Sequence, residues 1–529
     1  MELRICVFEL FLFHFIFTGF ISAQNYDSAV KIFSNTILKD ELRSHVFKLA
    51  SPEFEGRETS KTGQRRAAAY IAEQFFIKGV ASFYDTSYFQ RFPLMISSPD
   101  SSSLVIGGKT YKFMRDFYFL PGFQDTVIRG NEICYAGFGI SDDKTDEFKN
   151  SGAEDRIAVI FAGEPYDREK KRYFISGDTN PSAWSFNRQM KPLNAQRHGV
   201  TALLVITDSI EKKVREMKHY IESPMFTLSD GRTDRPVRIP VLFISEEIAS
   251  DIFAMNGSDL KKVFDKANKG KSKPMLIKSI ITIYVRRKKE NTSSENIAGF
   301  IRGNGKPEEV ILITAHYDHL GKDGNEIYYG ADDDASGTAA VIEIAEAFAI
   351  AKKNGFTPER SILFMPVAGE EKGLLGSGYY TRNPLFPLNK TVADLNIDMI
   401  GRMDAAHDGN PDYVYIIGSD KLSTELHKIN EEANKKSVNI ALDYTYNSPD
   451  DPNRFYYRSD HYNFAKYDIP VIFYFTGVHA DYHKPTDTPD KIHFEKMEKI
   501  TRLIFYTAWE LANREERIKV DVVNVFEKY

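Results

Sequence analysis

Seven acidic and histidine residues stand in order along about a third of this chain, and their types suit metal chemistry. They are His316, Asp318, Asp333, Glu370, Glu371, Asp398 and His483. Several follow directly after an apolar run, which is where an open α/β sheet delivers side chains to a shared crevice. A set of histidines and carboxylates without cysteine is what two closely spaced zinc ions need. The series therefore points to metal-assisted hydrolysis.

The pair His316 and Asp318 follows an apolar run over residues 310–315. Residues i and i+2 of an extended segment point to the same side. His316 can therefore bind a metal ion while Asp318 holds the other ring nitrogen and fixes the tautomer. Taken alone, a His-x-Asp pair fits an ordinary polar strand end better, so its weight comes from the rest of the series.

Three consecutive acids, Asp332, Asp333 and Asp334, stand between two glycines just before a predicted helix. Acids at this place cap a helix N-terminus and complement its dipole, which accounts for at least Asp334. Buried acids near another aspartate and a histidine repel one another unless a cation is present. A carboxylate that bridges two metal ions relieves this repulsion.

The adjacent acids Glu370 and Glu371 follow an apolar run over residues 361–368. Adjacent acids are usually surface residues, but these stand at the carboxyl end of a predicted strand, where open α/β sheets place their sites. Their side chains diverge, so one can bind metal while the other reaches the attacking water. A base distinct from the ligands is what metal-assisted hydrolysis requires.

Asp398 and His483 are candidate metal ligands only because of their place in the series. Asp398 ends an apolar run, where a lone aspartate is most often a turn former. For His483 there are three alternatives of the same residue type, namely His407, His461 and His479. Spacing alone does not choose among these four histidines.

The elements that must position these residues are indicated by hydrophobic periodicity. Predicted strands cover 310–315, 361–368, 395–398 and 470–475, and predicted helices cover 67–76, 336–353 and 494–511. Apolar strands separated by helices predict an α/β fold with a mostly parallel, mixed central sheet flanked by helices. We expect this domain to be discontinuous, formed by residues 24–105 and 286–529.

Residues 106–285 have a different texture from the chain on either side. Short apolar strands alternate there with charged, turn-rich connections. This stretch contains no plausible constellation of catalytic residues. We therefore expect a separate, β-rich α/β domain inserted into the first one.

Bulk composition excludes one class of partner. The 529 residues carry a formal net charge of -5 and a pI of about 6.2, so the basic footprint of a nucleic-acid-binding protein is missing. Cys6 and Cys134 are the two cysteines of the sequence. Cys6 falls in the leader described next, so we expect no intramolecular disulfide in the mature chain.

The first 23 residues read as a signal peptide. Arg4 precedes an apolar run over residues 5–21 that ends in Ser22 and Ala23. The alternative is a membrane anchor, but the run is short for a span. We expect cleavage after Ala23, no stable membrane anchor after cleavage, and export to the periplasm or the medium.

Taken together, these motifs resemble the co-catalytic zinc aminopeptidases. That family includes bacterial leucyl aminopeptidases and aminopeptidase S, glutamate carboxypeptidase II and the non-enzymatic transferrin receptor. The resemblance covers residues from about 290 to 515, with a looser match before residue 105. The inserted region resembles a protease-associated domain. The implied fold is zinc-exopeptidase-like, with two zinc ions per chain.

The resemblance also implies a role for each residue of the series. The terminal ligands of the two zinc ions are expected to be, in pairs, His316 with Asp398 and Glu371 with His483. Asp333 is expected to be the bridging ligand and Glu370 the general base. Asp318 is expected to be the partner of His316, and Tyr482 an oxyanion-stabilising phenol. In this family the peptide bond after the bridging aspartate is often cis, and a segment like Ser459-Asp460-His461 lies near the substrate cleft.

The implied activity is that of an exported zinc-dependent aminopeptidase, which hydrolyses the N-terminal residues of peptides with a free N-terminus by direct attack of water. Carboxypeptidase-like and glutaminyl-cyclase-like activities on the same scaffold are alternatives. The cyclases use one zinc ion, so the presence of both His316 and Asp398 argues against them. A non-catalytic binding homologue is the third alternative, and the complete ligand set argues against it.

Overall fold

The computed structural model describes residues 23–524, except 85, 124, 143–144 and 232–238. The predicted signal peptide, apart from its last residue Ala23, therefore lies outside the described residues. The chain divides into two compact units. Unit 1 combines Met1–Pro93 with Ser293–Tyr529, and unit 2 is Leu94–Thr292.

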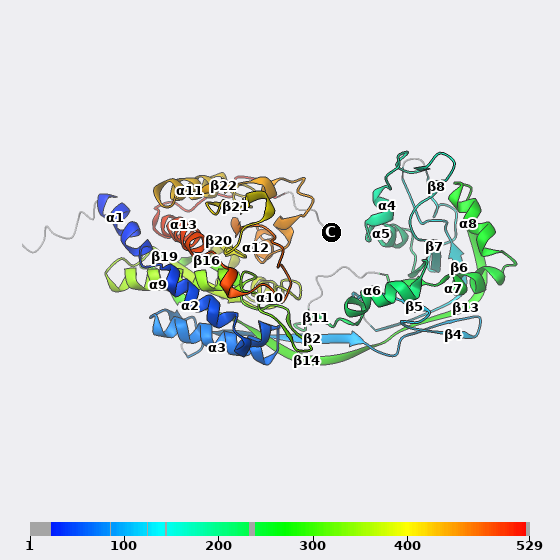
Figure 1. Ribbon diagram of the computed structural model, residues 1–529, viewed down its shortest axis with the longest axis horizontal. Coiled ribbons are helices and arrows are strands. Elements are labelled where there is room, and N and C mark those ends of the chain that lie inside the picture. Colours follow the sequence, from blue (N-terminus) through cyan, green and yellow to red (C-terminus); the bar gives the residue numbers. More distant parts are fainter. Residues whose placement is uncertain (1–22, 85, 124, 143–144, 232–238, 525–529) are drawn as a thin grey trace, which may run out of the picture. The chain divides into compact units, whose positions relative to one another are not determined.

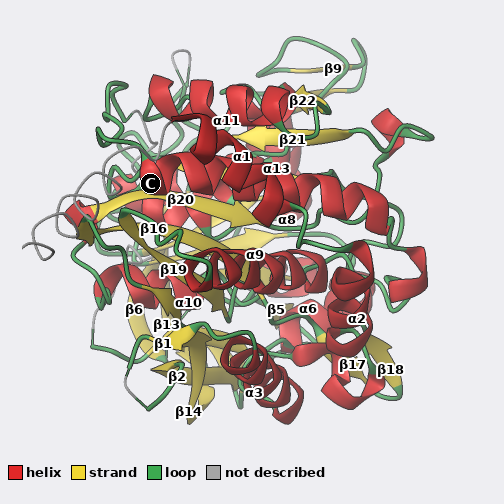
Figure 2. Ribbon diagram, turned by 90° about the vertical axis from the view of Figure 1, so that its left-hand side faces the viewer, coloured by secondary structure: helices red, strands yellow, loops and turns green. Residues whose placement is uncertain are grey.

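Unit 1 contains an eight-stranded sheet with the strand order β1-β15-β19-β16-β20-β23-β21-β22. The strands are β1 (Ala81–Ser82), β15 (Gly299–Ile301), β16 (Lys306–His316), β19 (Arg360–Val367), β20 (Thr391–Ile397), β21 (Tyr413–Ile417), β22 (Ala441–Asp443) and β23 (Val471–Phe475). The central strands β19, β16, β20 and β23 are parallel to one another, whereas β15 and β21 pair antiparallel with β19 and β23. Figure 2 shows β16, β19 and β20 as neighbours in this sheet.

The central strands of the unit 1 sheet are buried along their whole length, which indicates that both faces of the sheet are covered. Helices provide this cover. On β19, Phe364 packs against Phe348 of α9 (Ala335–Lys353), with ring centroids 6.1 Å apart. The next residue, Met365, belongs to a buried cluster with Phe464 of α12 (His461–Ala465). Successive side chains of a strand point to opposite faces, so α9 and α12 lie on opposite faces of the sheet.

The other long helices of unit 1 complete these layers (Figure 1). They are α1 (Ala23–Ser34), α2 (Lys39–Leu49), α3 (Thr62–Ile77), α10 (Leu375–Arg382), α11 (Thr424–Lys436) and α13 (Phe494–Asn513). Phe505 of α13 contacts Phe348 of α9, which places α13 on the α9 face. Unit 1 thus has the predicted α/β fold, with a mostly parallel, mixed sheet between two layers of helices.

Unit 2 has a sheet and a core of its own. Its eight-stranded sheet has the order β4-β3-β13-β6-β7-β10-β12-β5. The strands are β3 (Ser103–Ile106), β4 (Lys109–Lys112), β5 (Phe117–Tyr118), β6 (Thr126–Tyr135), β7 (Ile157–Phe161), β10 (Ala202–Ile206), β12 (Val241–Ile244) and β13 (Met275–Val285). Its helices are α4 (Ala183–Phe186), α5 (Met190–Arg197), α6 (Ile210–Glu222), α7 (Glu246–Ala254) and α8 (Leu260–Asn268). β6, β7, β10 and β12 run parallel, and β13 and β3 extend the sheet antiparallel.

The boundaries of the units differ from those expected after residue 105 and before residue 286, because both of these positions fall inside unit 2. The physical reason is strand pairing. β3 pairs antiparallel with β13, from Ile106 opposite Ile281 to Ser103 opposite Tyr284. This pairing draws residues 103–105, which precede the expected start of the inserted domain, into the unit 2 sheet. The boundaries fall within β2 (Phe89–Pro99) and β14 (Arg287–Ile297). The likeness of unit 2 to a protease-associated domain stays a prediction.

Among the described residues of both units, no helix combines the length and the apolar character needed to cross a membrane.

Candidate metal centre

The seven residues of the series converge at the carboxyl ends of the central strands of unit 1. His316 is the last residue of β16, Glu370 and Glu371 follow β19, and Asp398 follows β20. Because β19, β16 and β20 are parallel neighbours, their carboxyl ends lie at one edge of the sheet. A pocket at this edge is lined by residues that include His316, Asp333, Glu370, Asp398, Tyr482 and His483.

Asp333 lies between two histidines. Its Oδ1 is 3.1 Å from His316 Nε2, and its Oδ2 is 3.1 Å from His483 Nε2. Burial raises the pKa of this carboxyl, but the hydrogen bonds from His316 and His483 outweigh burial and hold the pKa of Asp333 well below its usual range. Each carboxylate oxygen therefore faces a different imidazole, which is the arrangement that a bridging ligand needs.

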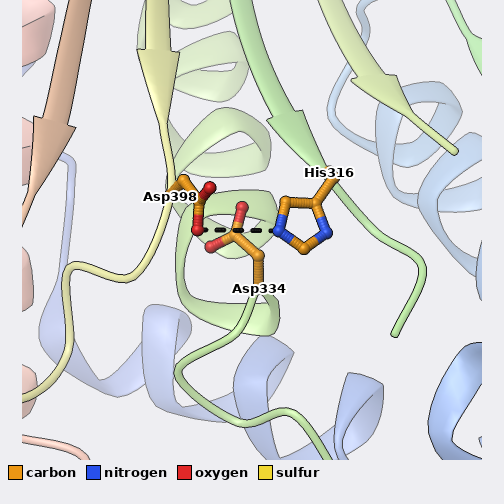
Figure 3. A group of neighbouring side chains, drawn as sticks. All are labelled: His316, Asp334 and Asp398. Carbon is orange, nitrogen blue, oxygen red and sulfur yellow. Dashed lines mark ion pairs between the residues drawn. The ribbon is translucent and has the colours of Figure 1, made fainter. Parts of the chain in front are cut away.

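Figure 3 shows the first half of the site, formed by His316, Asp334 and Asp398. His316 Nε2 lies 3.5 Å from Asp398 Oδ1. Asp334 Oδ1 accepts hydrogen bonds from the backbone N–H of Gly337 at 2.8 Å and of Met399 at 3.1 Å. Asp334 therefore caps α9, as expected, and also holds the chain that follows β20. The peptide bond between Asp333 and Asp334 is cis, as the family resemblance implied.

The second half of the site is formed by Glu371 and two histidines. Glu371 Oε2 lies 3.3 Å from His483 Nε2, and Glu371 Oε1 lies 2.8 Å from His319 Nδ1. His319 Nδ1 is also 3.8 Å from Asp333 Oδ2. Against the effect of burial, the hydrogen bonds from His319 and His483 lower the pKa of Glu371 to about 2. Glu371 is therefore an ionised carboxylate near neutral pH.

His319 was not among the residues singled out from the sequence. It is fully buried, and its ring faces Asp333 and Glu371 from the same turn that carries His316 and Asp318. The available signal was the run His316-Tyr-Asp-His319, because a histidine one residue beyond the His-x-Asp pair is close enough to reach the same site.

Asp318 supports the site in a way that the sequence did not indicate. His316 Nδ1 lies 3.0 Å from the backbone oxygen of Asp318 but 3.9 Å from its carboxylate. The carboxylate instead accepts hydrogen bonds from the backbone N–H of Glu370 at 3.2 Å and from Thr59 Oγ1 at 2.6 Å. The backbone of Asp318 thus orients His316, while its side chain holds the backbone of Glu370.

Glu370 and Tyr482 line the pocket without taking part in the ion pairs around Asp333. Burial, together with the negative charges of Glu371 and Asp398, raises the pKa of Glu370 well above its usual range. Burial and the charges of Asp333 and Glu371 raise the pKa of Tyr482, so its phenol stays protonated near neutral pH. The Tyr482 ring stacks on His483 with centroids 3.8 Å apart. The pocket thus offers one carboxyl group able to exchange protons and one hydroxyl donor.

The structure separates His483 from the three alternative histidines. His479 Nε2 lies 3.3 Å from Asp332 Oδ2, and His407 Nδ1 lies 3.1 Å from Asp404 Oδ1. The ring of His461 is buried and stacks on Phe473 with centroids 4.8 Å apart. Of these four histidines, His483 is the one whose ring faces both Asp333 and Glu371.

The segment Ser459-Asp460-His461 borders the pocket, which Ser459 lines. Ser459 Oγ donates a hydrogen bond to Asp398 Oδ2 at 2.7 Å, and Asn396 Nδ2 donates to Ser459 Oγ at 2.9 Å. Ser377 Oγ donates to Asp460 Oδ1 at 2.5 Å. Ser459 therefore fixes one oxygen of Asp398 and leaves the other facing His316.

The donor set suits zinc. Imidazole and carboxylate groups without thiolates are ligands that zinc accepts, and here they gather around the two oxygens of Asp333. Asp334 Oδ2 is buried and has no hydrogen-bond partner among the described residues. Buried carboxylate oxygens without donors are costly unless a cation compensates them. The chemistry of the donors, together with this buried oxygen that lacks a partner, favours bound cations.

Comparisons with known proteins agree with this chemistry. Residues 296–508 match peptidase family M28. A probable zinc metalloprotease of Leptosphaeria maculans is 37% identical over 109 residues, which cover 20% of this chain and 24% of that protein. A probable leucine aminopeptidase of Arthroderma otae is 30% identical over 214 residues, which cover 39% of this chain and 56% of that protein. The chain therefore spans about half or less of the length of these relatives.

Among solved structures, an aminopeptidase from Aneurinibacillus sp. strain AM-1 resembles nearly the whole chain. The TM-score is 0.52, and the match covers 94% of this chain and 98% of that one. The sequence identity is 18%, so this likeness concerns the fold alone.

Proposed function

We propose that this chain, whose residues 296–508 match peptidase family M28, is an exported aminopeptidase that uses two zinc ions to remove N-terminal residues from peptides. The names of two relatives, a probable zinc metalloprotease and a probable leucine aminopeptidase, support the metal and the reaction class. These relatives match 20% and 39% of this chain, and we propose the same metal and reaction class for the whole chain.

One observation carries the proposal of two metal ions rather than one. The carboxylate oxygens of Asp333 face opposite histidines, each at 3.1 Å, and each histidine has a further acid beside it. His316 is paired with Asp398, and His483 with Glu371. The proposed ligands of one zinc ion are His316, Asp333 and Asp398, and those of the other are Asp333, Glu371 and His483.

Glu370 is the proposed general base. Bound zinc supplies Lewis acidity, which lowers the pKa of a water to about 7 and polarises the scissile carbonyl. Glu370 takes a proton from the attacking water as its oxygen bonds to the carbonyl carbon. When the C–N bond breaks, Glu370 returns the proton to the leaving amine. The hydrogen bond from Glu370 N to the Asp318 carboxylate positions this base.

Tyr482 is the proposed donor to the carbonyl oxygen that becomes negative in the transition state. Its phenol lines the pocket and stays protonated near neutral pH because its pKa is raised. The aminopeptidase name of one relative supports cleavage from the N-terminal end.

A carboxypeptidase-like reaction is the second candidate, and one observation favours it. Arg458 also lines the pocket, on the side of Phe455. A guanidinium binds carboxylates in a bidentate manner, so Arg458 can receive the C-terminal carboxylate of a peptide.

Metal analysis coupled to cleavage of a peptide panel tests the proposal. We expect two zinc ions per chain and release of the first residue from free peptides, with no cleavage of N-acetylated peptides. Cleavage of N-acetylated peptides from their C-terminus would favour the carboxypeptidase-like reaction. One zinc ion per chain would favour a cyclase-like activity, and zinc-replete protein that cleaves neither class would favour a binding protein.

Export is proposed from the sequence of the leader. N-terminal sequencing of the protein recovered from the medium or periplasm tests it. We expect the mature chain to begin at Gln24, whereas a mature chain that retains residues 5–21 would indicate an anchor.

A further inference from the structure

Arg57 is a buried cation outside the segment that matches the peptidase family. It ends η1 (Pro52–Arg57) in the N-terminal part of unit 1, and its side chain is fully buried. Buried arginines are rare because removing the charge from water is costly. The contacts of Arg57 must therefore offset this cost.

The Arg57 guanidinium donates four hydrogen bonds, all to backbone carbonyls. Nε donates to Tyr317 O at 2.8 Å, and Nη2 donates to Gly330 O at 2.8 Å. Nη1 donates to Leu49 O at 2.7 Å and to Tyr329 O at 2.8 Å. One side chain thus joins the local backbone at Leu49 to two stretches that are 260 or more residues away in the sequence.

Two of these stretches carry proposed metal ligands. Tyr317 directly follows His316, and Gly330 stands three residues before Asp333. The backbone of Arg57 adds a further contact, because its carbonyl accepts a hydrogen bond from His319 N at 3.2 Å. Arg57 therefore links the turn that holds His316 and His319 to the loop that holds Asp333.

The backbone around Arg57 takes a costly conformation that aims the side chain inward. Glu55, Gly56 and Arg57 have φ values of 51°, 68° and 53°, all in the left-handed region. A Cβ on Gly56 would lie 2.3 Å from Gly321 O, so only glycine fits there. Left-handed conformations at non-glycine residues persist where the surroundings compensate their cost, and they cluster at functional sites.

The charge of Arg57 also faces the acids of the site. Burial lowers the pKa of Arg57 to about 10, while the carboxylates of Asp333, Asp334 and Asp487 oppose this lowering. Arg57 thus remains a cation near neutral pH and attracts the acid-bearing loop toward the turn that follows β16.

We propose that Arg57 is a positioning residue that sets the spacing between His316 and Asp333 and thereby the geometry and affinity of the metal centre. This inference rests on the proposed zinc chemistry. The direct consequence is that the N-terminal segment, which lies outside residues 296–508, is part of the working site.

Arg360 offers a matched control for the loss of a buried arginine. It is also fully buried, and it donates to Leu511 O and Arg514 O through Nη1 and to Glu309 Oε2 through Nε. It stands at the start of β19, whereas the proposed ligands follow the other end of that strand. The variants Arg57→Met and Arg360→Met therefore remove similar numbers of hydrogen bonds, one set beside the site and one set away from it.

The test compares zinc dissociation constants, by competition with a chelator, and the visible absorption spectra of the cobalt-substituted proteins. In Arg57→Met we expect an affinity loss of about 10- to 100-fold, as for other residues that orient ligands, and a changed cobalt spectrum. In Arg360→Met we expect a lower thermal midpoint with wild-type affinity and spectrum. Arg57→Lys keeps the positive charge but can donate fewer hydrogen bonds, so we expect an intermediate loss of zinc affinity. This variant provides a test even if Arg57→Met does not fold.

Two outcomes overturn the inference. The first is a wild-type zinc affinity and cobalt spectrum in folded Arg57→Met or Arg57→Lys protein. The second is an equal loss in Arg360→Met, since the effect would then be one of general stability. A wild-type chain that binds no zinc would overturn the proposed function itself, which keeps the two failures distinct.

Discussion

His319 Nδ1 lies 2.8 Å from Glu371 Oε1, while His483 Nε2 lies 3.3 Å from the other oxygen of that carboxylate, Oε2. His319 Nδ1 also lies 3.8 Å from Asp333 Oδ2, so its ring contacts two proposed ligands of the same zinc ion. Residues that orient a ligand from behind commonly contribute 10- to 100-fold to metal affinity. His319 is thus placed to act on one of the two proposed zinc ions.

Replacement of His319 should weaken zinc binding at the Glu371 side. In His319→Ala we expect about a 10- to 100-fold loss of affinity for one of two zinc ions, measured by titration with a metal indicator. His319→Asn keeps an N–H donor near the position of Nδ1 and should retain more of the affinity. Two zinc ions bound with wild-type affinity in the alanine variant would contradict a role for His319.

Replacement of Glu370 should separate catalysis from metal binding. Glu370→Gln removes the base and should lower kcat by about 100- to 10,000-fold while both zinc ions remain bound. Glu371→Gln is the comparison, because it changes a proposed ligand and should lower zinc content as well. Turnover near that of the wild type in Glu370→Gln would exclude Glu370 as the base.

Removal of zinc should destabilise unit 1. The cations compensate buried carboxylates around Asp333, and a ligand present at 100 times its dissociation constant stabilises the folded state by about 3 kcal/mol. We expect a lower thermal midpoint after chelation, with recovery on adding zinc but not magnesium. In Asp333→Asn the midpoint should respond little to zinc. A full response in that variant would argue against Asp333 as the bridge.

Arg458 distinguishes the two candidate reactions. If the carboxyl end of the substrate docks on it, Arg458→Gln should raise KM for peptide acids and leave KM for peptide amides unchanged. In an aminopeptidase we expect both substrates to be affected alike. The measurement is a pair of KM values for one peptide in its acid and amide forms.

The stability of unit 1 should fall in mild acid because of His45. Its Nε2 lies 3.1 Å from Glu343 Oε1 and its Nδ1 lies 2.6 Å from Tyr70 OH. Burial and the charge of Lys78 lower the pKa of His45 to about 4. The folded state keeps this ring neutral while the unfolded chain gains a proton, so stability present above pH 6.5 is lost as the pH falls toward 4.

The matched variant for this acid effect is His45→Gln, whose amide can donate to Glu343 and accept from Tyr70 without titrating. Between pH 7 and pH 5 the wild type should lose about 2 kcal/mol more unfolding free energy than the variant. Urea unfolding at the two pH values measures the difference. Equal losses in the two proteins would assign the acid sensitivity to other groups.

The strand ends and their acids were predictable because two local signals agree there. Apolar runs predicted β16 and β19, and His316, Glu370 and Glu371 stand at or shortly after the carboxyl ends of these strands. The parallel arrangement then follows from strands separated by helices. These features depend on short stretches of sequence, which periodicity can resolve.

Other features depend on contacts between distant segments and were not predictable. The link from Arg57 to Gly330 spans 273 residues, and nothing in the sequence near Arg57 indicates it. The first limit of unit 2 was misplaced because the pairing of β3 with β13 joins residues far apart in the chain. The position of Asp318 near the site was predictable from the sequence. Whether its backbone oxygen or its carboxylate faces His316 depends on the conformation of the turn.

The division of unit 1 has a consequence for the order in which the site is made. Arg57 leaves the ribosome before all of unit 2, and Tyr317 and Gly330 leave after it. His483 follows still later, so the nascent chain cannot assemble both halves of the metal centre until most of it has been synthesised. Unit 2, which has its own core, can fold during this interval. Metal capture is therefore expected to be one of the last steps in the maturation of the protein.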